Sequence, residues 1–265
     1  EPFWPRVEAR LASAAHAGAE VFVLPEYCGL QLLWPDHRPA DGSELMNLAS
    51  AQAAGYADRM QALAADHGLW IVAGSIPERG SDGRIRNTCV IASPAGALWR
   101  QPKCLMTAWE RDFGVVGGDE LLVFLAGELR FAVAVCYDVE VPELARQAGA
   151  AGAELLFVPS FTEAHWGSRR VNRCAAGIAE SSQMVVATAS LAGSLPLVEL
   201  DATCARSLIL APSHPGFPED GCFARAAEDR DELLIADIDL GLLRQVRAGA
   251  DVNPLRDAAM GARVR

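Results

Sequence analysis

The sequence has no apolar run long enough to cross a membrane and no residues spaced to hold a metal ion. A membrane-spanning helix needs roughly 18 apolar residues in a row, whereas the longest runs, such as FAVAVC at 131–136, have the length of a strand. The first residues, EPFWPR, show no succession of basic, apolar and small residues, so we expect no signal peptide and a cytoplasmic location. The sequence has no C-x-x-C motif and no two histidines three or four residues apart, so we predict no metal site.

Positive charge is scarce in this sequence. It has 34 acidic residues against 23 lysines and arginines, a net charge of −11, which excludes proteins that bind nucleic acid or anionic membranes through a basic face. Only one of the 23 basic residues is a lysine, Lys103. Because the other basic positions all use arginine, we infer that Lys103 serves chemistry rather than solubility, since a compact ammonium can approach a reacting oxygen.

The seven cysteines are irregularly spaced, and a disulfide framework is typical of small secreted chains rather than of a chain with 265 residues. We therefore expect reduced thiols. Cys136 stands out because it follows a predicted strand and precedes a helix that begins near Pro142. A cysteine at such a turn lies beside backbone N–H groups, which suits a nucleophile and an oxyanion site, although a buried core cysteine is the commoner case.

Short apolar runs alternate with alanine-rich stretches along the chain, which indicates an α/β protein. The runs are nearly continuous in apolar residues, as in strands covered on both faces. No glycine- or serine-rich linker and no charge run divides the chain, so we predict one domain over residues 1–265. The predicted strands are 21–25, 70–75, 89–93, 131–136, 155–160, 184–189, 207–212 and 233–238, and the predicted helices are 6–18, 50–67, 140–152, 169–182 and 240–248.

A nucleophilic cysteine needs a base and a group that favours its thiolate. His165 is the one histidine whose setting allows that role, and carboxylates and the single lysine are the alternatives. Glu26 follows a predicted strand, at the place where open α/β sheets bind ligands. Glu110 follows Lys103 by seven residues, close enough to hold the ammonium in place.

Three motifs in the same order resemble the nitrilase superfamily of carbon–nitrogen hydrolases. They are the PE of VLPEYCG with Glu26, Lys103 followed seven residues later by Glu110, and the CYD–PE of VCYDVEVPELAR with Cys136. The successive separations are 77, 7 and 26 residues, and the resemblance extends from about residue 6 to 257. The segments QLL, VPSF, RVNRCA and GFPEDG are similar to the branch of the superfamily that is often fused to an acetyltransferase-like domain.

The resemblance implies a four-layer α-β-β-α sandwich, with two sheets face to face and helices outside. Members of the superfamily open with a strand before the first helix, and this sequence starts at or inside that helix. We expect that strand to lie upstream or to be absent, which would leave an unpaired sheet edge. The resemblance also implies a homodimer or higher homo-oligomer, in which the C-terminal segment 241–265 reaches across a neighbour.

The resemblance implies a role for each catalytic candidate. Glu26 takes the proton of Cys136, Lys103 and the backbone N–H of Tyr137 stabilise the tetrahedral intermediate, and Glu110 orients Lys103. The Lys103 ammonium is expected to favour the Cys136 thiolate. The substrate is a small amide, hydrolysed through a Cys136 thioester without metal or cofactor. The candidate oxyanion and substrate-binding residues are Tyr137, Trp109, Phe161, His165 and Trp166.

Four other interpretations stay open at this point. The same site could hydrolyse nitriles, although the Tyr-Asp after Cys136 resembles the amidase-type branches. The chain could be a catalytically silent nitrilase-like binding module. It could be a thiol hydrolase that pairs Cys136 with His165. Finally, it could be a plain α/β scaffold in which Cys136 belongs to the core.

Overall fold

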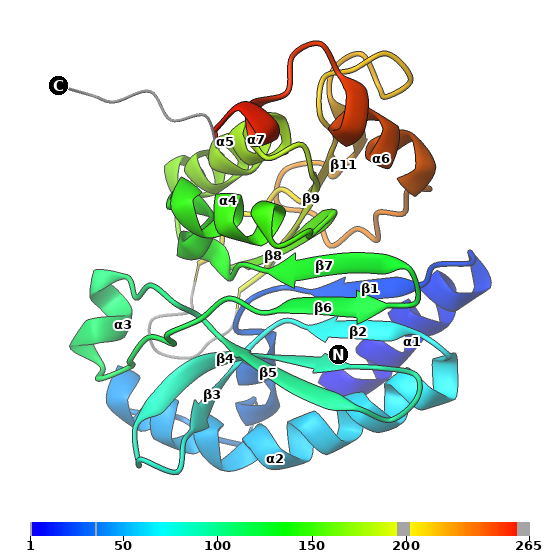
Figure 1. The fold of residues 1–265 in the computed structure, drawn as a ribbon. Coiled ribbons are helices and arrows are strands. Elements are labelled where there is room, and N and C mark those ends of the chain that lie inside the picture. Colours follow the sequence, from blue (N-terminus) through cyan, green and yellow to red (C-terminus); the bar gives the residue numbers. More distant parts are fainter. Residues whose placement is uncertain (1, 35, 195–201, 259–265) are drawn as a thin grey trace, which may run out of the picture.

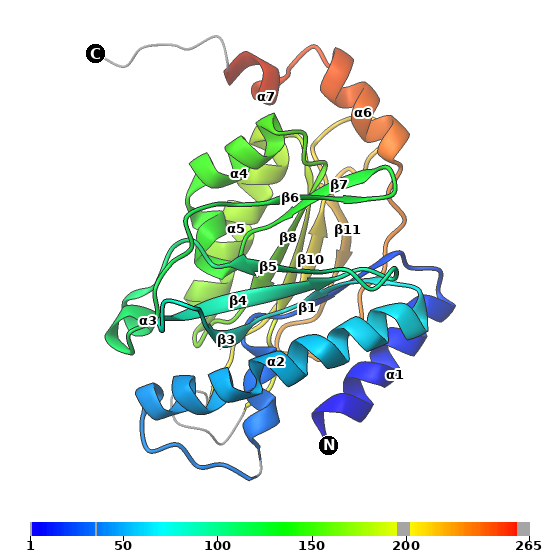
Figure 2. The same cartoon turned by 60° about the horizontal axis from the view of Figure 1, so that its bottom comes forward.

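Two β-sheets pack face to face between two layers of helices in the computed structural model of the chain (Figure 1). The structure describes residues 2–34, 36–194 and 202–258. Helices α1 (Phe3–His16) and α2 (Gly42–His67) cover the outer face of one sheet, and α4 (Pro142–Ala150) and α5 (His165–Ser181) cover the outer face of the other (Figure 2). The predicted α-β-β-α order is confirmed.

The first sheet has five strands, four of them in the order β1-β2-β4-β3. The fifth, β5, pairs with β4, and only β1 and β2 run parallel to each other. The strands are β1 (Val21–Leu24), β2 (Trp70–Ala73), β3 (Ile76–Arg79), β4 (Ile85–Ala92) and β5 (Leu98–Pro102).

The second sheet has six strands in the order β11-β10-β9-β8-β7-β6. Its centre is parallel, since β8 pairs in parallel with both β7 and β9. The strands are β6 (Val123–Ala126), β7 (Leu129–Val133), β8 (Leu155–Ser160), β9 (Val185–Ser190), β10 (Leu208–Leu210) and β11 (Cys222–Arg225).

Aromatic side chains join the two sheets. Trp70 of β2 meets Phe131 of β7 edge to face, with ring centroids 5.8 Å apart, and Trp99 of β5 meets Phe124 of β6 at 6.1 Å. Such rings bury large apolar areas and favour edge-to-face contacts. One apolar cluster therefore lies between the sheets, and a second lies between the first sheet and helices α1 and α2.

Helices α1, α2 and α5 begin earlier than the apolar pattern predicts, whereas α4 begins two residues later than predicted. Helix α2 starts at Gly42 rather than residue 50, because the Asp41 side chain accepts a hydrogen bond from the Glu44 N–H and caps the helix. It ends at Gly68, whose positive φ of 67° suits a residue without Cβ. The last two helices are α6 (Leu240–Gly249) and α7 (Pro254–Asp257). Among the described helices, none combines the length and apolar composition needed to cross a bilayer.

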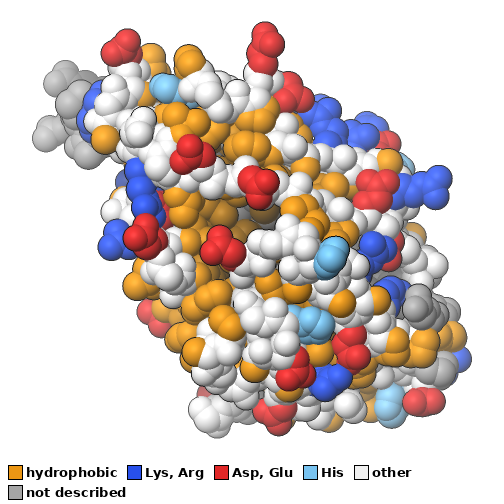
Figure 3. Space-filling view, turned by 90° about the vertical axis from the view of Figure 1, so that its right-hand side faces the viewer, with side chains coloured by type: hydrophobic (Ala, Val, Ile, Leu, Met, Phe, Trp, Pro, Cys, Tyr) orange, Lys and Arg blue, Asp and Glu red, His pale blue; other side chains and the backbone are white. Residues whose placement is uncertain are grey.

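The prediction of a strand at 233–238 is wrong: this segment is described and forms neither strand nor helix. A strand needs a hydrogen-bonded neighbour, and a cavity of about 1080 Å³ separates the segment from β1; both line it. Figure 3 looks onto this side of the molecule and shows a hollow surrounded by apolar side chains. Within the described residues, β1 pairs only with β2, so its other edge faces the cavity. The prediction also missed β3, β5, β6 and β11.

Candidate active site

The four predicted catalytic side chains come from four separate segments and lie in one buried cluster. Glu26 follows β1, Lys103 follows β5, Glu110 belongs to the short helix α3 (Ala108–Asp112), and Cys136 begins the 3-10 turn η2 (Cys136–Glu140) after β7. Glu26, Lys103 and Glu110 are each 1% exposed and Cys136 is 6% exposed. None of the four lines the large cavity beside β1.

Lys103 is held between two carboxylates. Its Nζ donates to Glu26 Oε1 at 2.9 Å and to Glu110 Oε2 at 2.8 Å. Burial disfavours the ammonium, but the carboxylates of Glu26 and Glu110 outweigh it and raise the pKa of Lys103. A permanent positive charge is therefore present at the centre of the cluster.

Glu26 is anchored through both of its carboxylate oxygens. Oε1 accepts from Lys103 and from Asn87 Nδ2, at 2.9 Å each, and Oε2 accepts from the Phe161 backbone N–H at 2.8 Å. Burial raises the pKa of Glu26, and Lys103 opposes this shift without cancelling it. A carboxylate whose pKa lies above its usual value, and which binds the same Phe161 backbone as Cys136, is suited to accept the thiol proton.

Glu110 is fixed by the start of its own helix. Its Oε2 accepts from the Thr107 backbone N–H at 2.9 Å, and the Thr107 hydroxyl accepts from the Glu110 N–H, which together form a capping box. Burial alone would raise its pKa, but the Lys103 ammonium lowers the pKa below the usual value. Glu110 therefore stays ionised and orients Lys103.

Cys136 adopts a backbone conformation that a residue with a Cβ rarely takes, with φ at 48°. Such strain persists where the surrounding structure imposes it and often marks a functional residue. Its Sγ lies 3.4 Å from the Phe161 carbonyl oxygen. Burial, and then the Glu26 carboxylate, raise the pKa of the thiol well above its usual value, and Lys103 offsets only part of this. Lys103 thus favours the Cys136 thiolate as expected, but burial and Glu26 outweigh it, so Cys136 rests as a thiol that needs a base.

Two residues of the cluster were missed from the sequence. Asn87, fully buried on β4, donates from Nδ2 to Glu26 Oε1 and to Glu110 Oε1 at 2.9 Å each. Tyr27, with φ at 57°, donates its hydroxyl to Glu110 Oε1 at 2.9 Å. Tyr27 directly follows Glu26 in its motif and Asn87 lies in none of the motifs, and the contacts of both arise only when β1, β4 and α3 meet.

Comparison with known proteins matches residues 1–248 to the model of the carbon-nitrogen hydrolase family. The chain belongs to the carbon–nitrogen hydrolases. It is 31% identical over 262 residues to the probable hydrolase YhcX of Bacillus subtilis, a match that covers 97% of this chain and 50% of YhcX, so the chain spans half the length of that relative. It is 26% identical to the omega-amidase NIT2 of Xenopus tropicalis, covering 89% of this chain and 83% of that protein.

Solved structures share the fold of this carbon–nitrogen hydrolase. An amidase from Nesterenkonia sp. AN1 superposes with a TM-score of 0.73 at 22% identity, over 91% of this chain and 89% of that one. A mutant of an amidase from the same source, assigned to the nitrilase superfamily, has the same TM-score at 23% identity, over 92% and 87% of the two chains. The fold predicted from the motifs is thus confirmed.

Asp138 joins the two segments that carry the lysine and the nucleophile of this carbon–nitrogen hydrolase. Its carboxylate accepts from the backbone N–H groups of Cys104 at 3.1 Å and Leu105 at 2.8 Å, beside Lys103, and from Val135 at 3.2 Å. Burial raises the pKa of Asp138 to about 6, against these three hydrogen bonds. The Asp of the CYD motif therefore acts as a positioning residue.

Two of the predicted pocket residues, Phe161 and Trp109, lie at the cluster. Their rings surround Tyr27, with centroids 6.2 Å and 5.8 Å from its ring. Phe161 also contacts Glu26 and Cys136 through its backbone. Tyr137 follows the nucleophile directly and is partly buried; its role in binding the oxyanion stays a prediction.

The other two predicted pocket residues, His165 and Trp166, are more exposed. Trp166 is 70% exposed, with the Arg170 guanidinium 5.2 Å from its ring centroid. The His165 side chain is 52% exposed and lies 3.8 Å from Asp229 Oδ2. The His165 imidazole lies beside Asp229, whereas Glu26 and Cys136 both bind the Phe161 backbone. This arrangement favours the carboxylate over the histidine as the base.

Proposed function

We propose that this carbon–nitrogen hydrolase converts small linear amides to carboxylic acids and ammonia through a thioester on Cys136. The observation that carries the proposal is the buried Lys103 ammonium held between two carboxylates, one of which, Glu26, is bound to the same Phe161 backbone as the Cys136 thiol. Nucleophile, base and positive charge thus meet in a single water-poor cluster, where each electrostatic contact is strengthened.

The first half of the reaction makes the thioester. Glu26 takes the Cys136 proton as Sγ attacks the amide carbon, and the carbonyl oxygen becomes an oxyanion that Lys103 and the Tyr137 backbone N–H stabilise. The C–N bond then breaks, and protonated Glu26 gives its proton to the leaving nitrogen. The products of this half are ammonia and the Cys136 thioester.

The second half regenerates the enzyme. Glu26, ionised again, takes a proton from a water molecule that attacks the thioester carbon, and Lys103 stabilises the second tetrahedral intermediate. When the C–S bond breaks, the proton returns from Glu26 to Cys136. The acid leaves, and no external reductant, oxidant or cofactor enters the balance.

Amides are favoured over nitriles by the relatives. The omega-amidase NIT2 and the Nesterenkonia amidase both act on amides by name, and in one mutant of that amidase acrylamide is added to the active-site cysteine. A nitrilase of Pyrococcus abyssi is 25% identical over 96% of this chain, so nitriles belong in the test.

The free state of all seven cysteines supports a cytoplasmic setting, where thiols stay reduced.

The test is ammonia release from paired substrates. The purified protein is given butyramide, a monoamide of a dicarboxylic acid, and the nitriles of the same carbon skeletons. We expect ammonia from at least one amide and a lower kcat/KM on its nitrile. Cys136→Ala should lower kcat by roughly 10⁴-fold or more. The control is Cys174→Ala, which removes a half-buried thiol on α5 and should leave kcat unchanged.

Two results would contradict the proposal. Turnover of nitriles with none of their amides would assign the same site to nitrile hydrolysis. Failure of every amide and nitrile, together with failure of an aldehyde to form a thiohemiacetal with Cys136, would favour the silent binding module.

A further inference from the structure

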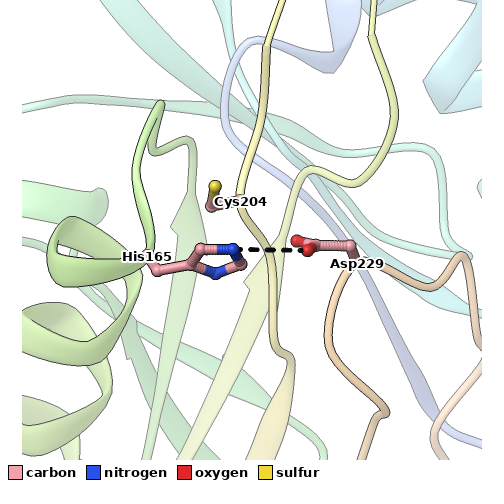
Figure 4. A group of neighbouring side chains, drawn as sticks. All are labelled: His165, Cys204 and Asp229. Atoms are coloured by element: carbon pink, nitrogen blue, oxygen red, sulfur yellow. Dashed lines mark ion pairs between the residues drawn. The ribbon is translucent and has the colours of Figure 1, made fainter.

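His165, Cys204 and Asp229 gather into one group outside the reaction described above (Figure 4). His165 begins α5, Cys204 precedes β10, and Asp229 follows β11. One ligand atom from each residue lies within 4.8 Å of the other two. The three side chains carry an imidazole nitrogen, a thiol sulfur and a carboxylate oxygen, which are the three kinds of protein ligand that zinc accepts.

The backbone holds two members of the group in place. The Cys204 N–H donates to the Thr162 carbonyl at 2.8 Å, and the Thr162 hydroxyl donates to the Cys204 carbonyl at 2.6 Å. The Asp229 N–H donates to the Ala205 carbonyl, and the Ala205 N–H donates to Asp229 Oδ1, both at 2.9 Å. Cys204 and Asp229 are therefore joined through adjacent residues, and the hydrogen bond to Oδ1 orients the carboxylate, as hydrogen-bond partners of metal ligands do.

The remaining carboxylate oxygen faces the histidine across a gap. Asp229 Oδ2 and His165 Nε2 are 3.8 Å apart, beyond the range of a hydrogen bond. Two ligand atoms at about 2.1 Å from a tetrahedral zinc ion are about 3.4 Å apart, so a small side-chain adjustment would fit the ion between them. The two side chains are 52% and 43% exposed, so an ion and a water ligand can enter from solvent.

We propose that His165, Cys204 and Asp229 bind a zinc ion, with water as the fourth ligand. Zinc takes nitrogen, sulfur and oxygen together, whereas magnesium and calcium prefer oxygen alone. The Cys204 thiol releases its proton to solvent as the Zn–S bond forms. The sequence predicts no metal site because these ligands are 39 and 25 residues apart and converge only in the fold.

The site is adjacent to a loop that contacts the catalytic cluster. Thr162, which holds Cys204, follows Phe161, and Phe161 binds Glu26 and Cys136 through its backbone. A zinc ion ties the start of α5 to the segments of Cys204 and Asp229. Zinc therefore stabilises the loop at 161–165 that helps to position the catalytic base.

The test uses Co²⁺ as a spectroscopic probe of cysteine ligation. It is carried out on untagged protein with Cys136→Ala, so that the nucleophile cannot supply the sulfur ligand. We expect one equivalent of Co²⁺ to produce a thiolate-to-cobalt charge-transfer band with tetrahedral d–d absorption, and Zn²⁺ to displace it. Adding Cys204→Ser should abolish the charge-transfer band. The control, Cys222→Ser, removes another half-buried thiol and should preserve the band.

Affinity for Zn²⁺ gives an independent measurement. In competition with a chromogenic chelator, His165→Ala and Asp229→Asn should each weaken binding by about tenfold or more. If Cys204→Ser fails to fold, as judged by thermal unfolding without metal, these two variants carry the test. Absence of a charge-transfer band in the parent, its persistence in Cys204→Ser, or unchanged affinity in the other two variants would overturn the proposal.

Discussion

Two buried carboxylates, Glu26 and Glu110, share one ammonium and one amide donor, Asn87. Buried charges in this arrangement contribute little net stability, because desolvation offsets their attraction. Removing one partner, by contrast, leaves an uncompensated buried charge. The single lysine of the sequence is therefore needed for the stability of the site as well as for the chemistry proposed.

We expect Lys103→Met to lower the free energy of unfolding by about 3–5 kcal/mol at neutral pH. Without the ammonium, the folded-state pKa values of Glu26 and Glu110 rise above their values in the unfolded chain. The folded state then binds more protons, so stability falls as pH rises through the raised values and is regained in acid. Guanidinium denaturation of the parent and of Lys103→Met at about pH 5 and about pH 8 measures this pH dependence of the free energy of unfolding.

The matched control for this variant is Arg84→Met. Arg84 is an exposed cation paired with Asp82 at 2.8 Å, and such a solvent-screened pair contributes little to stability. An equal decrease in the free energy of unfolding in both variants would show that the carboxylates are not coupled through Lys103. A decrease in Lys103→Met that does not depend on pH would show the same.

The thiol state of Cys136 predicts how it reacts with a reagent that is not an amide. Its raised pKa means that the reactive thiolate is a small fraction at neutral pH. Its modification by methyl methanethiolsulfonate should accelerate by about tenfold per pH unit through the alkaline range. Lys103→Ala should slow the reaction further, because Lys103 lowers the thiol pKa. Peptide mass mapping measures the rate of modification at Cys136. A fast reaction in mild acid that does not depend on pH would refute the assignment of Cys136 as a resting thiol.

At the scale of elements, the active site depends on how the segment after β5 is attached to the turn after β7. Asp138 makes this attachment through three backbone N–H groups, and Lys103 and Cys136 lie on its two sides. Buried donors that lose their acceptor cost about 1–3 kcal/mol each. The attachment is therefore a target for a mutation that leaves every catalytic side chain in the sequence.

We expect Asp138→Ala to lower kcat by roughly 100-fold, because displacing Lys103 removes stabilisation of the oxyanion. KM should change less than kcat, since Phe161 lies on another segment, after β8. Asp138→Asn, which keeps an acceptor oxygen, should restore part of kcat. Steady-state kinetics on the amide identified above measures both variants, and equal activity of Asp138→Ala and the parent would remove the positioning role.

At the scale of the whole molecule, a cavity of about 1080 Å³ beside β1 departs from a filled sandwich. It is bordered by the unpaired edge of β1, by α1 and by the segment 233–238. The expectation that a strand precedes the first helix stays a prediction. The cavity lies where a strand parallel to β1 and leading into α1 would complete a right-handed β-α-β unit.

We expect an added strand to stabilise the protein. Six alternating valine and threonine residues placed directly before Pro2 should raise the unfolding temperature by about 4 °C or more, because they bury apolar area and pair with β1. They should also reduce the fluorescence of anilinonaphthalene sulfonate bound to the protein. A glycine–serine segment of the same length is the control, and an equal effect of both segments would contradict the prediction.

The assembly state is also a prediction at this scale. We expect a homodimer or larger homo-oligomer, and light scattering coupled to gel filtration measures its mass. The C-terminal segment predicted to reach across a neighbour includes residues 259–265, which lie outside the described residues. A monomeric mass at micromolar concentration would refute the expectation.

The sequence by itself determined the α/β class, and its resemblance to the nitrilase superfamily gave the layer order and the four catalytic candidates. Apolar runs that are continuous rather than alternating indicate strands covered on both sides, and the spacing of Glu26, Lys103, Glu110 and Cys136 needs no coordinates to be recognised. The short strands β3, β5, β6 and β11 were harder to predict although each pairs with an adjacent strand along the chain, because each is only partly buried and most lack a continuous apolar run. The apolar run at 233–238 pairs with no strand among the described residues and stays irregular.

Only the tertiary structure decided how the groups act on one another. Asn87, Tyr27 and Asp138 join the site through contacts between residues dozens of positions apart, and Cys136 rests as a thiol because burial and Glu26 outweigh Lys103. The grouping of His165 with Cys204 and Asp229 has the same origin. Residue type determines which chemistry a side chain can perform, whereas its pKa and its partners depend on solvent exclusion and distance, which arise only when the chain folds.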